Sequence, residues 1–450
     1  MKIVIIGNGI AGTNAARFIR KWSDHEIVMI SGETTYPFSR TALMYVYMGH
    51  LKLEHTKLYE DDFWAKNRIQ LRKNWVKHID CGQKLLLLED GTQITYDKLI
   101  LATGSKSNKF GWEGQDLEGV QGLYHLQDLE QMERLSRGGI NRAVIVGGGL
   151  IGIEMAEMFH SRHIPVTFLV REKSFWDNIL PQEESQMINQ HIVKHGIDLR
   201  LSTELKSIHG KENKVDFVLT NTGEKIPSQF VGLTVGVSPN IEFVKNSGVV
   251  TNRGIVVNEW LQTSDPDVYA IGDCAELSQP PSGRRSIEAI WYTGRMMGQT
   301  VAYSICKSPQ KYAPGIWFNS AKFFDIEYQV YGSIKPNLEA DHATIYWQHP
   351  TENKAIRVNY HAKGKQVTGF NLMGIRYRHE VCEKWIKEKA SIENVLQHLS
   401  LANFDPEFFE TYEGALVQQY NQQNGTKLQL RAEKGLNKVT RFLKSIAQNN

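Results

Sequence analysis

Cysteine is scarce in this chain: only positions 81, 274, 306 and 382 among 450 residues carry it, and no two form a C-x-x-C pair. Such spacing argues against a disulfide framework and a cysteine-based metal site, and we predict no metal. Long apolar runs are also missing, because none reaches the roughly 20 residues that a membrane-spanning helix needs. The first apolar run, Ile3–Ile6, stops at Gly7 and does not resemble a secretion leader, so we expect a cytoplasmic protein.

Neither sign of charge is in large excess. Lys and Arg total 52 and Asp and Glu total 49, a net charge of +3. A balance this close excludes general attraction to nucleic acid. With 41% hydrophobic and 22% charged residues, the chain is expected to be globular, and its length predicts about two to four domains.

A glycine-rich turn near the start carries the first functional signal. The β-branched run Lys2–Ile6 is typical of a strand buried in a parallel sheet, and it leads into Gly7-Asn8-Gly9-Ile10-Ala11-Gly12. A helix over Thr13–Trp22 and a strand over Glu26–Ile30 are predicted to follow. This order is the context of a dinucleotide-binding fingerprint, in which the helix N-terminus attracts phosphate.

The same pattern occurs a second time. The strand Ala143–Val146 precedes Gly147-Gly148-Gly149-Leu150-Ile151-Gly152, then a helix to about His160 and a strand over Val166–Val170. Two copies, each between a strand and a helix, predict an α/β fold with two Rossmann-like dinucleotide-binding domains. After about Pro314, aromatic-rich strands precede a helical end, which predicts a C-terminal α+β domain.

These motifs resemble those of the pyridine nucleotide-disulfide oxidoreductase family over residues 1 to about 330. The resemblance implies FAD on the first glycine turn and NADH or NADPH on the second. It also implies an FAD-binding domain in two parts, 1–110 and 241–313, around an NAD(P)-binding domain at 111–240, with an interface domain at 314–450. Glu33 lies where the family's ribose-binding acid belongs, and Gly272-Asp273 resembles the segment that contacts the ribityl and phosphate part of FAD.

The resemblance gives two sets of candidate binding residues. Those expected to hold FAD are Gly7, Gly9, Ile10, Ala11, Gly12, Glu33, Arg40, Val76, Ala102, Thr103, Gly104, Gly272, Asp273, Glu288 and Ile290. Those expected to hold the nicotinamide nucleotide are Gly147, Gly149, Leu150, Ile151, Gly152, Arg171 and Gly236.

Two candidate catalytic positions come from a closer resemblance. The segment Tyr36–Leu43, with Arg40, is similar to the P-Y-x-R-P-x-L-S-K segment of ferredoxin and rubredoxin reductases and of nitrite reductase flavin modules. The lysine that many of these proteins place beside the flavin corresponds here to Tyr45. Glu154 matches the acid near the nicotinamide, whose usual partner is that lysine.

The region between Arg20 and His78 contains no cysteine, which excludes thiolate chemistry at the position where disulfide reductases have it. We therefore predict an FAD-dependent NAD(P)H oxidoreductase that passes electrons to a small carrier such as ferredoxin or rubredoxin. Two alternatives remain: a type II NADH:quinone oxidoreductase at a membrane surface, and a non-catalytic flavoprotein that senses nicotinamide.

The nucleotide preference depends on the end of the Val166–Val170 strand. NADH-binding folds usually end this strand with an acid that hydrogen-bonds the ribose 2′-hydroxyl, whereas a 2′-phosphate is accommodated by arginine. Here Val170 takes the acid's place and Arg171 follows it, which favours NADPH slightly. NADH remains the alternative, because a one-residue shift in register would direct the Glu172 carboxylate at the ribose.

The C-terminal region gives weaker signals. Trp317-Phe318-Asn319-Ser320, with Asp325 and Gln329, loosely resembles the segment that opens the interface domain of ferredoxin reductases. Residues 434–446 have the pattern of a basic amphipathic helix, which fits either an anionic membrane surface or the protein's own body. A homodimer is left open.

Overall fold

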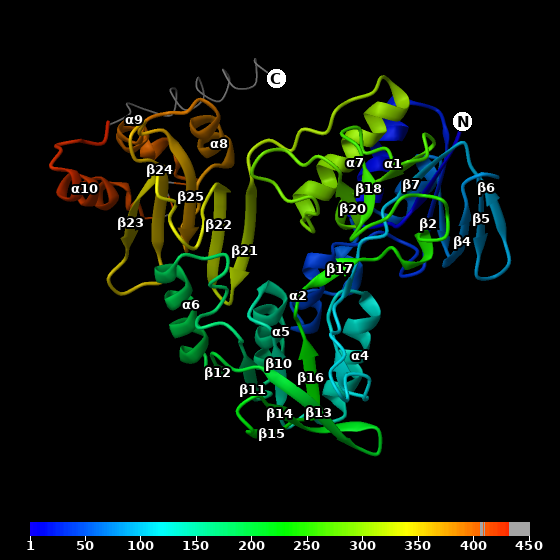
Figure 1. Ribbon diagram of the computed structural model, residues 1–450, viewed down its shortest axis with the longest axis horizontal. Helices are drawn as coiled ribbons and strands as arrows, with labels where there is room; N and C mark the ends of the chain where they lie inside the picture. Colours follow the sequence, from blue (N-terminus) through cyan, green and yellow to red (C-terminus); the bar gives the residue numbers. More distant parts are fainter. Residues whose placement is uncertain (406–407, 409, 432–450) are drawn as a thin grey trace. The chain divides into compact units, whose positions relative to one another are not determined.

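The computed structural model describes residues 1–405, 408 and 410–431 (Figure 1). The chain divides by contacts into two units. The first combines Met1–Lys173 with Ile192–Pro314, and the second combines Ser174–His191 with the chain from Gly315 onward. The finer division into four segments remains a prediction.

The first unit contains a parallel five-stranded sheet with the order β19-β7-β1-β2-β3. Its strands are β1 (Lys2–Ile6), β2 (Glu26–Ser31), β3 (Ile69–Lys73), β7 (Lys98–Leu101) and β19 (Val268–Ala270). The central strands are almost continuously apolar because both faces of the sheet are covered.

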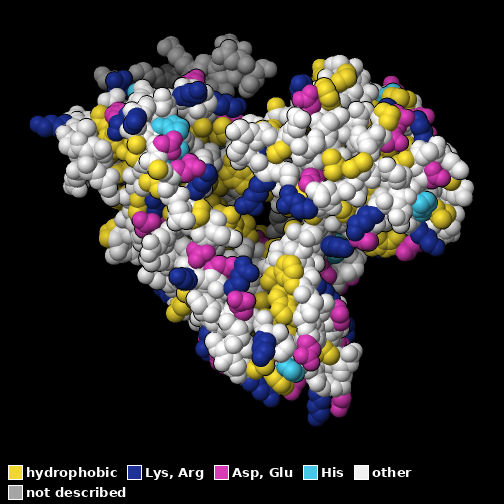
Figure 2. Space-filling model, viewed as in Figure 1, with side chains coloured by type: hydrophobic (Ala, Val, Ile, Leu, Met, Phe, Trp, Pro, Cys, Tyr) yellow, Lys and Arg dark blue, Asp and Glu magenta, His cyan; other side chains and the backbone are white. Residues whose placement is uncertain are grey.

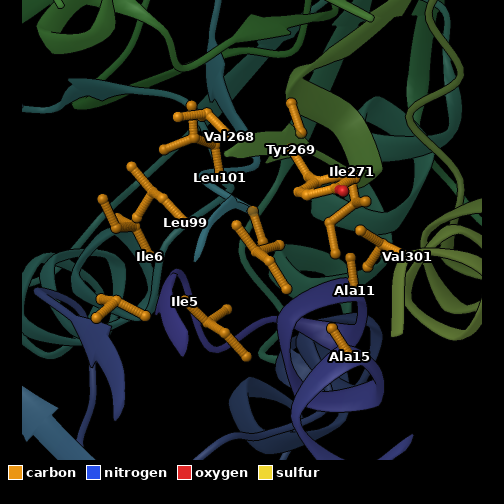
Figure 3. Close-up of a cluster of buried hydrophobic side chains, with 14 of the residues drawn as sticks. Ile5, Ile6, Ala11, Ala15, Leu99, Leu101, Val268, Tyr269, Ile271 and Val301 are labelled. Atoms are coloured by element: carbon orange, nitrogen blue, oxygen red, sulfur yellow. The ribbon is translucent and has the colours of Figure 1, made fainter. Parts of the chain in front are cut away.

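Helices α1 (Ile10–Trp22) and α7 (Trp291–Cys306) pack closely together. Gly298 permits the close approach, because a Cβ there would lie 2.5 Å from the carbonyl oxygen of Ala11. Val301 of α7 joins Ala11, Ala15 and side chains of β1, β7 and β19 in one buried cluster (Figure 3). This packing fixes the N-termini of both helices relative to the sheet.

A second parallel sheet in the same unit has the order β12-β11-β10-β16-β9. Its strands are β9 (Val120–Gln121), β10 (Ala143–Val146), β11 (Val166–Leu169), β12 (Asp198–Arg200) and β16 (Phe230–Leu233). Helix α5 (Leu150–Ser161) packs on this sheet, α4 (Leu126–Arg137) belongs to the same unit, and most of α6 (Gln182–Lys194) belongs to the second unit.

Smaller elements complete the first unit. They are two antiparallel three-stranded sheets, β4 (Val76–Asp80) with β5 (Leu85–Leu88) and β6 (Gln93–Thr95), and β13 (Leu205–Lys211) with β14 (Lys214–Thr220) and β15 (Lys225–Pro227). Two strand pairs, β8 (Ser105–Ser107) with β17 (Val237–Pro239) and β18 (Ile255–Val257) with β20 (Ala275–Leu277), and the short helices α2 (Leu43–Tyr47) and α3 (Asp61–Lys66) are also present.

The second unit is built on an antiparallel sheet with the order β21-β22-β25-β24-β23. Its strands are β21 (Phe318–Phe323), β22 (Ile326–Gly332), β23 (His342–Gln348), β24 (Ala355–His361) and β25 (Val367–Met373), and its helices are α8 (His379–Lys387), α9 (Ile392–Gln397) and α10 (Glu413–Asn424) (Figure 1). Ile356 and Val358 pack into the core shared with these helices, whereas Arg357, between them, donates to the buried Glu184 carboxylate at 2.7 Å.

The predicted fold class is confirmed: two parallel dinucleotide-type sheets and a C-terminal α+β part. The first helix begins at Ile10 rather than at the predicted Thr13, because the last residues of the glycine turn already have helical geometry. The predicted basic helix at 434–446 lies outside the described residues. Among the described helices, none combines the length and the hydrophobicity that a membrane span requires.

Candidate functional site

A cavity of about 550 Å³ lies in the first unit at the carboxyl ends of its parallel strands. The carboxyl ends of four neighbouring strands line it: Gly7–Ala11 after β1, Ser31–Glu33 at the end of β2, Ala102–Gly104 after β7 and Ile271–Asp273 after β19. Ligands of open α/β sheets bind at this edge, and the volume suits a large organic ligand.

The glycine turn after β1 forms one wall of the cavity. Gly7 has φ +108°, and a Cβ on it would lie 2.0 Å from the Ala102 carbonyl oxygen, so only glycine fits. A Cβ on Gly12 would lie 2.0 Å from the Gly7 carbonyl oxygen, which places Gly12 in the packing of α1 on β1 and outside the cavity lining. At Gly9 a Cβ would meet no atom within 4 Å.

Helix α1 therefore presents an open N-terminus to the cavity. No side chain caps it, and its first turn contains no acid. Helix α7, which starts at Trp291 beside the same cavity, also lacks a side-chain cap and an acidic residue in its first turn. Unsatisfied N–H groups and the helix dipole favour an anion such as a pyrophosphate at these positions. The glycine cradle and the uncapped helices fit the dinucleotide FAD.

Glu33 and Arg40 both line the cavity and bind each other. Arg40 Nη1 and Nη2 donate to Glu33 Oε1 and Oε2 at 2.9 and 2.6 Å, and the backbone N–H of Leu126 donates to Oε1 at 2.7 Å. Burial would raise the pKa of Glu33, but the neighbouring His125 ring and the Arg40 guanidinium lower it to about 2. The predicted ribose-binding acid thus orients Arg40 and the start of α4.

Asp273 lines the cavity next to Tyr124. Its Oδ2 accepts hydrogen bonds from the Tyr124 hydroxyl at 3.0 Å and the Ser105 hydroxyl at 3.2 Å. Burial raises the pKa of Asp273 despite these bonds. Arg40 lies over the Tyr124 ring, 4.5 Å from its centroid, and donates to the Tyr124 carbonyl oxygen. Asp273, Tyr124, Arg40 and Glu33 therefore form one connected polar wall.

Glu154 of α5 lines the cavity together with Ile151, so the second Rossmann unit contributes to this site. Burial raises the pKa of Glu154 to about 7, and the Glu157 carboxylate acts in the same direction. Tyr45, where the resemblance expects a lysine, is not among the lining residues, although its neighbours Leu43 and Met44 are. Its ring stacks on that of His50, with centroids 6.2 Å apart.

The structure does not bring Glu288 to the cavity. Its carboxylate is buried in an ion pair with Arg284, whose Nε and Nη2 both donate at 2.6 Å. The next residues, Ala289 and Ile290, do line the cavity. Val76, predicted as a binding residue, lines it too.

The second glycine turn repeats the geometry of the first. Gly147 has φ +113°, a Cβ on Gly152 would lie 2.3 Å from the Gly147 carbonyl oxygen, and a Cβ on Gly149 would meet nothing within 4 Å. Helix α5 starts at Leu150 without a side-chain cap or a first-turn acid. Apart from Ile151, the predicted nucleotide residues of this turn lie outside the cavity lining, as does Gly236, which has φ +89°.

The end of β11 places the residues that bear on nucleotide choice. Val170 is fully buried, and its side chain occupies the space that a Cβ on Gly148 would need, at 2.7 Å. Arg171 is exposed and donates to Glu172 Oε1 at 3.0 Å. A basic side chain therefore lies two residues beyond the end of β11.

Sequence reasoning missed several lining residues. Trp75 and Asn74 follow β3, and their position at the carboxyl end of a parallel strand could have identified them. Tyr124 and Trp291 carried no comparable signal. Among the described residues, no cysteine lines the cavity, and all four cysteines are free thiols.

Comparisons with known proteins agree with this geometry. The family model described as "Pyridine nucleotide-disulphide oxidoreductase" matches residues 1–302. The rubredoxin-NAD(+) reductase of Pseudomonas putida is 29% identical over 324 residues, 70% of this chain and 83% of that protein. The rhodocoxin reductase of Rhodococcus erythropolis is 32% identical over 283 residues, 62% of this chain and 66% of that protein.

A solved ferredoxin reductase from Rhodopseudomonas palustris has a similar fold, with a TM-score of 0.75, 24% identity, and coverage of 83% of this chain and 91% of that one. The chain belongs to the pyridine nucleotide-disulphide oxidoreductase family and is an FAD-dependent NAD(P)H oxidoreductase.

Proposed function

We propose that this protein is a reductase that takes electrons from NAD(P)H through FAD and delivers them to a small redox protein such as a ferredoxin or rubredoxin. The observation that carries the proposal is a dinucleotide-sized cavity with open helix N-termini and no cysteine among its described lining residues. Without a thiol at the flavin, electrons have to leave directly to an acceptor. The names of the rubredoxin and ferredoxin reductase relatives support the choice of acceptor.

When bound, FAD supplies the hydride acceptor and the ability to release electrons singly. The chain's residues supply binding and orientation. The Gly9–Ala11 backbone at the start of α1 binds the phosphates, and Arg40 contributes a positive charge to the same wall, held in place by Glu33.

Glu154 faces the side of the cavity where α5 enters, so we assign it to the nicotinamide side. With a pKa of about 7, its carboxyl group is partly protonated near neutral pH and then donates a hydrogen bond rather than presenting a full charge. Tyr45 supplies no positive charge in place of the family lysine. We infer that Glu154 acts here without the ion pair usual in the family.

The choice between NADH and NADPH rests on opposing arguments. The names of the rubredoxin reductase relatives favour NADH. The buried Val170 and the exposed Arg171 favour a 2′-phosphate, since charge-assisted hydrogen bonds from arginine bind phosphate well. We propose that Arg171 determines how well NADPH is used, whichever nucleotide is preferred.

Replacing Arg171 tests this assignment. A hydrogen bond to a charged group contributes about 1.5–3 kcal/mol, so Arg171→Leu should raise KM for NADPH about tenfold or more. KM for NADH should stay unchanged. Lys173→Leu, which removes an exposed charge from the same loop, is the matched control. Equal KM values for NADPH in wild type and Arg171→Leu contradict the assignment.

The acceptor is tested by steady-state turnover of the FAD-loaded protein with a ferredoxin, a rubredoxin and a water-soluble quinone. We expect fast reduction of a carrier protein that weakens as salt rises, because exposed charges guide such encounters. On the face seen in Figure 2, basic and acidic side chains are interspersed, so local patches have to provide this attraction. Fast turnover with quinone alone contradicts the proposal.

A further inference from the structure

Two histidines face each other at one end of the β23–β24 pair in the second unit. His342 and His361 are directly opposite in the antiparallel register, and their ring centroids are 4.4 Å apart. The His342 side chain is 11% exposed and the His361 side chain 43%, so the pair lies at the surface but is partly enclosed.

Carboxylates point at both rings. Asp341 Oδ1 lies 2.7 Å from His342 Nδ1, and Asp341 Oδ2 lies 3.6 Å from His361 Nδ1. Glu339 Oε2 lies 3.4 Å from His342 Nδ1, while the other oxygen of this carboxylate pairs with the Lys335 ammonium. One ligating atom from each of His342, His361 and Asp341 can be chosen so that all three atoms lie within 4.8 Å of one another.

Backbone hydrogen bonds fix the segment that carries these side chains. The N–H of His342 donates to the Glu339 carbonyl oxygen at 3.0 Å, and the N–H of Ala362 donates to the Asp341 carbonyl oxygen at 2.8 Å. The cluster therefore sits on a closed segment joined to a β-ladder, and little ordering is needed to bring its members together.

The spacing and chemistry suit zinc. Donor atoms around a tetrahedral Zn²⁺, with bonds of about 2.0–2.1 Å, are about 3.3 Å apart. The carboxylate–imidazole pairs above are separated by 2.7, 3.4 and 3.6 Å; the shortest is a hydrogen bond between His342 and Asp341 that the ion would replace, and the other two are close to the tetrahedral spacing. Imidazole with carboxylate is a usual donor set for Zn²⁺, whereas Ca²⁺ and Mg²⁺ require oxygen donors.

We propose that His342, His361 and Asp341, with Glu339 as the fourth ligand, form a Zn²⁺-binding site that clamps the β23–β24 end of the C-terminal sheet. The sequence did not indicate this site because its two histidines come from different strands and no cysteine takes part. This site is independent of the proposed electron transfer, since all its residues belong to the second unit.

The test uses the full-length, FAD-loaded protein after treatment with a chelator. Titration with ZnCl₂ by calorimetry should show one saturable equivalent, and CoCl₂ should give the visible absorption of tetrahedral cobalt. Loss of a ligand should weaken Zn²⁺ binding more than about tenfold in His361→Ala and in Asp341→Asn, because even outer-shell changes cost 10- to 100-fold. His78→Ala, which removes an exposed histidine of β4, should bind Zn²⁺ like wild type.

Two results overturn the proposal. One is the absence of a saturable equivalent in wild type, which would leave the cluster as ion pairs between carboxylates and histidines. The other is unchanged Zn²⁺ affinity in His361→Ala or in Asp341→Asn, which would place the ion on other groups. Circular dichroism verifies that each variant is folded, and the milder Asp341→Asn keeps the shape of the cluster if His361→Ala does not fold.

Discussion

Replacing Glu154 by glutamine tests the electrostatics of the cavity. Burial raises the pKa of this carboxyl group from 4.5 to about 7 in the folded protein. At about 1.36 kcal/mol per pKa unit, ionisation of Glu154 costs the folded state about 3 kcal/mol at most. Glutamine has nearly the same shape and stays neutral at every pH, so Glu154→Gln removes only this cost.

The sign of the effect depends on pH. Because the pKa is raised in the folded state, the cost is absent below about pH 4.5, appears as pH rises, and is complete above about pH 7. Glu154→Gln should therefore match wild type near pH 4.5. Above pH 7 its free energy of unfolding should exceed that of wild type by up to about 3 kcal/mol.

Urea unfolding followed by flavin fluorescence measures this difference, because flavin release reports the unit that contains the cavity. Glu130→Gln, on the exposed side of α4, is the control and should leave stability unchanged at both pH values. A stability difference between Glu154→Gln and wild type that is the same at pH 4.5 and pH 8 would refute the reasoning.

Three further predictions concern the cavity wall. Glu33→Gln should lower the free energy of unfolding by up to about 3 kcal/mol at pH 6, because the ionised Glu33 carboxylate, with its lowered pKa, stabilises the fold. In urea unfolding, the difference from wild type should fade as pH drops from about 4.5 towards 2, where this carboxylate becomes protonated. Gly9→Ala should fold normally but bind FAD more weakly, because its methyl group enters the open cradle, whereas Gly12→Ala should lower the free energy of unfolding by about 1–3 kcal/mol through overpacking against the Gly7 carbonyl. Flavin titration measures FAD binding and thermal melting measures stability. The same change in both quantities for the two variants contradicts the prediction. Trp75→Ala should weaken FAD binding about tenfold and Trp75→Phe much less, measured by flavin fluorescence, because aromatic stacking on a base contributes about 1–3 kcal/mol.

Local patterns predicted the two glycine turns well. The requirement for glycine at Gly7, Gly12, Gly147 and Gly152 comes from carbonyl oxygens that lie within 2.6 Å of a Cβ built there, and both strand–turn–helix units of this chain show this close packing. The turn at Asp90-Gly91, which joins the antiparallel strands β5 and β6, is likewise local, because an Asp-Gly pair between two apolar runs is typical of a hairpin turn.

Long-range partners could not be predicted. Nothing near Glu33 in the sequence indicates that Leu126, 93 residues later, donates to its carboxylate. Glu288 shows a different limit, because its partner Arg284 lies only four residues away and the family pattern of the segment still does not indicate that this local ion pair forms. Tertiary contacts decide which of several polar side chains face a site, and a linear motif does not contain them.

Anaerobic mixing of the FAD-loaded protein with NADH, and separately with NADPH, tests the central claim most directly. The account predicts rapid bleaching of the flavin absorption by at least one nucleotide, followed by recovery of the flavin when an oxidised ferredoxin or rubredoxin is added. Absence of bleaching with both nucleotides would contradict it, because electrons would then not enter from nicotinamide.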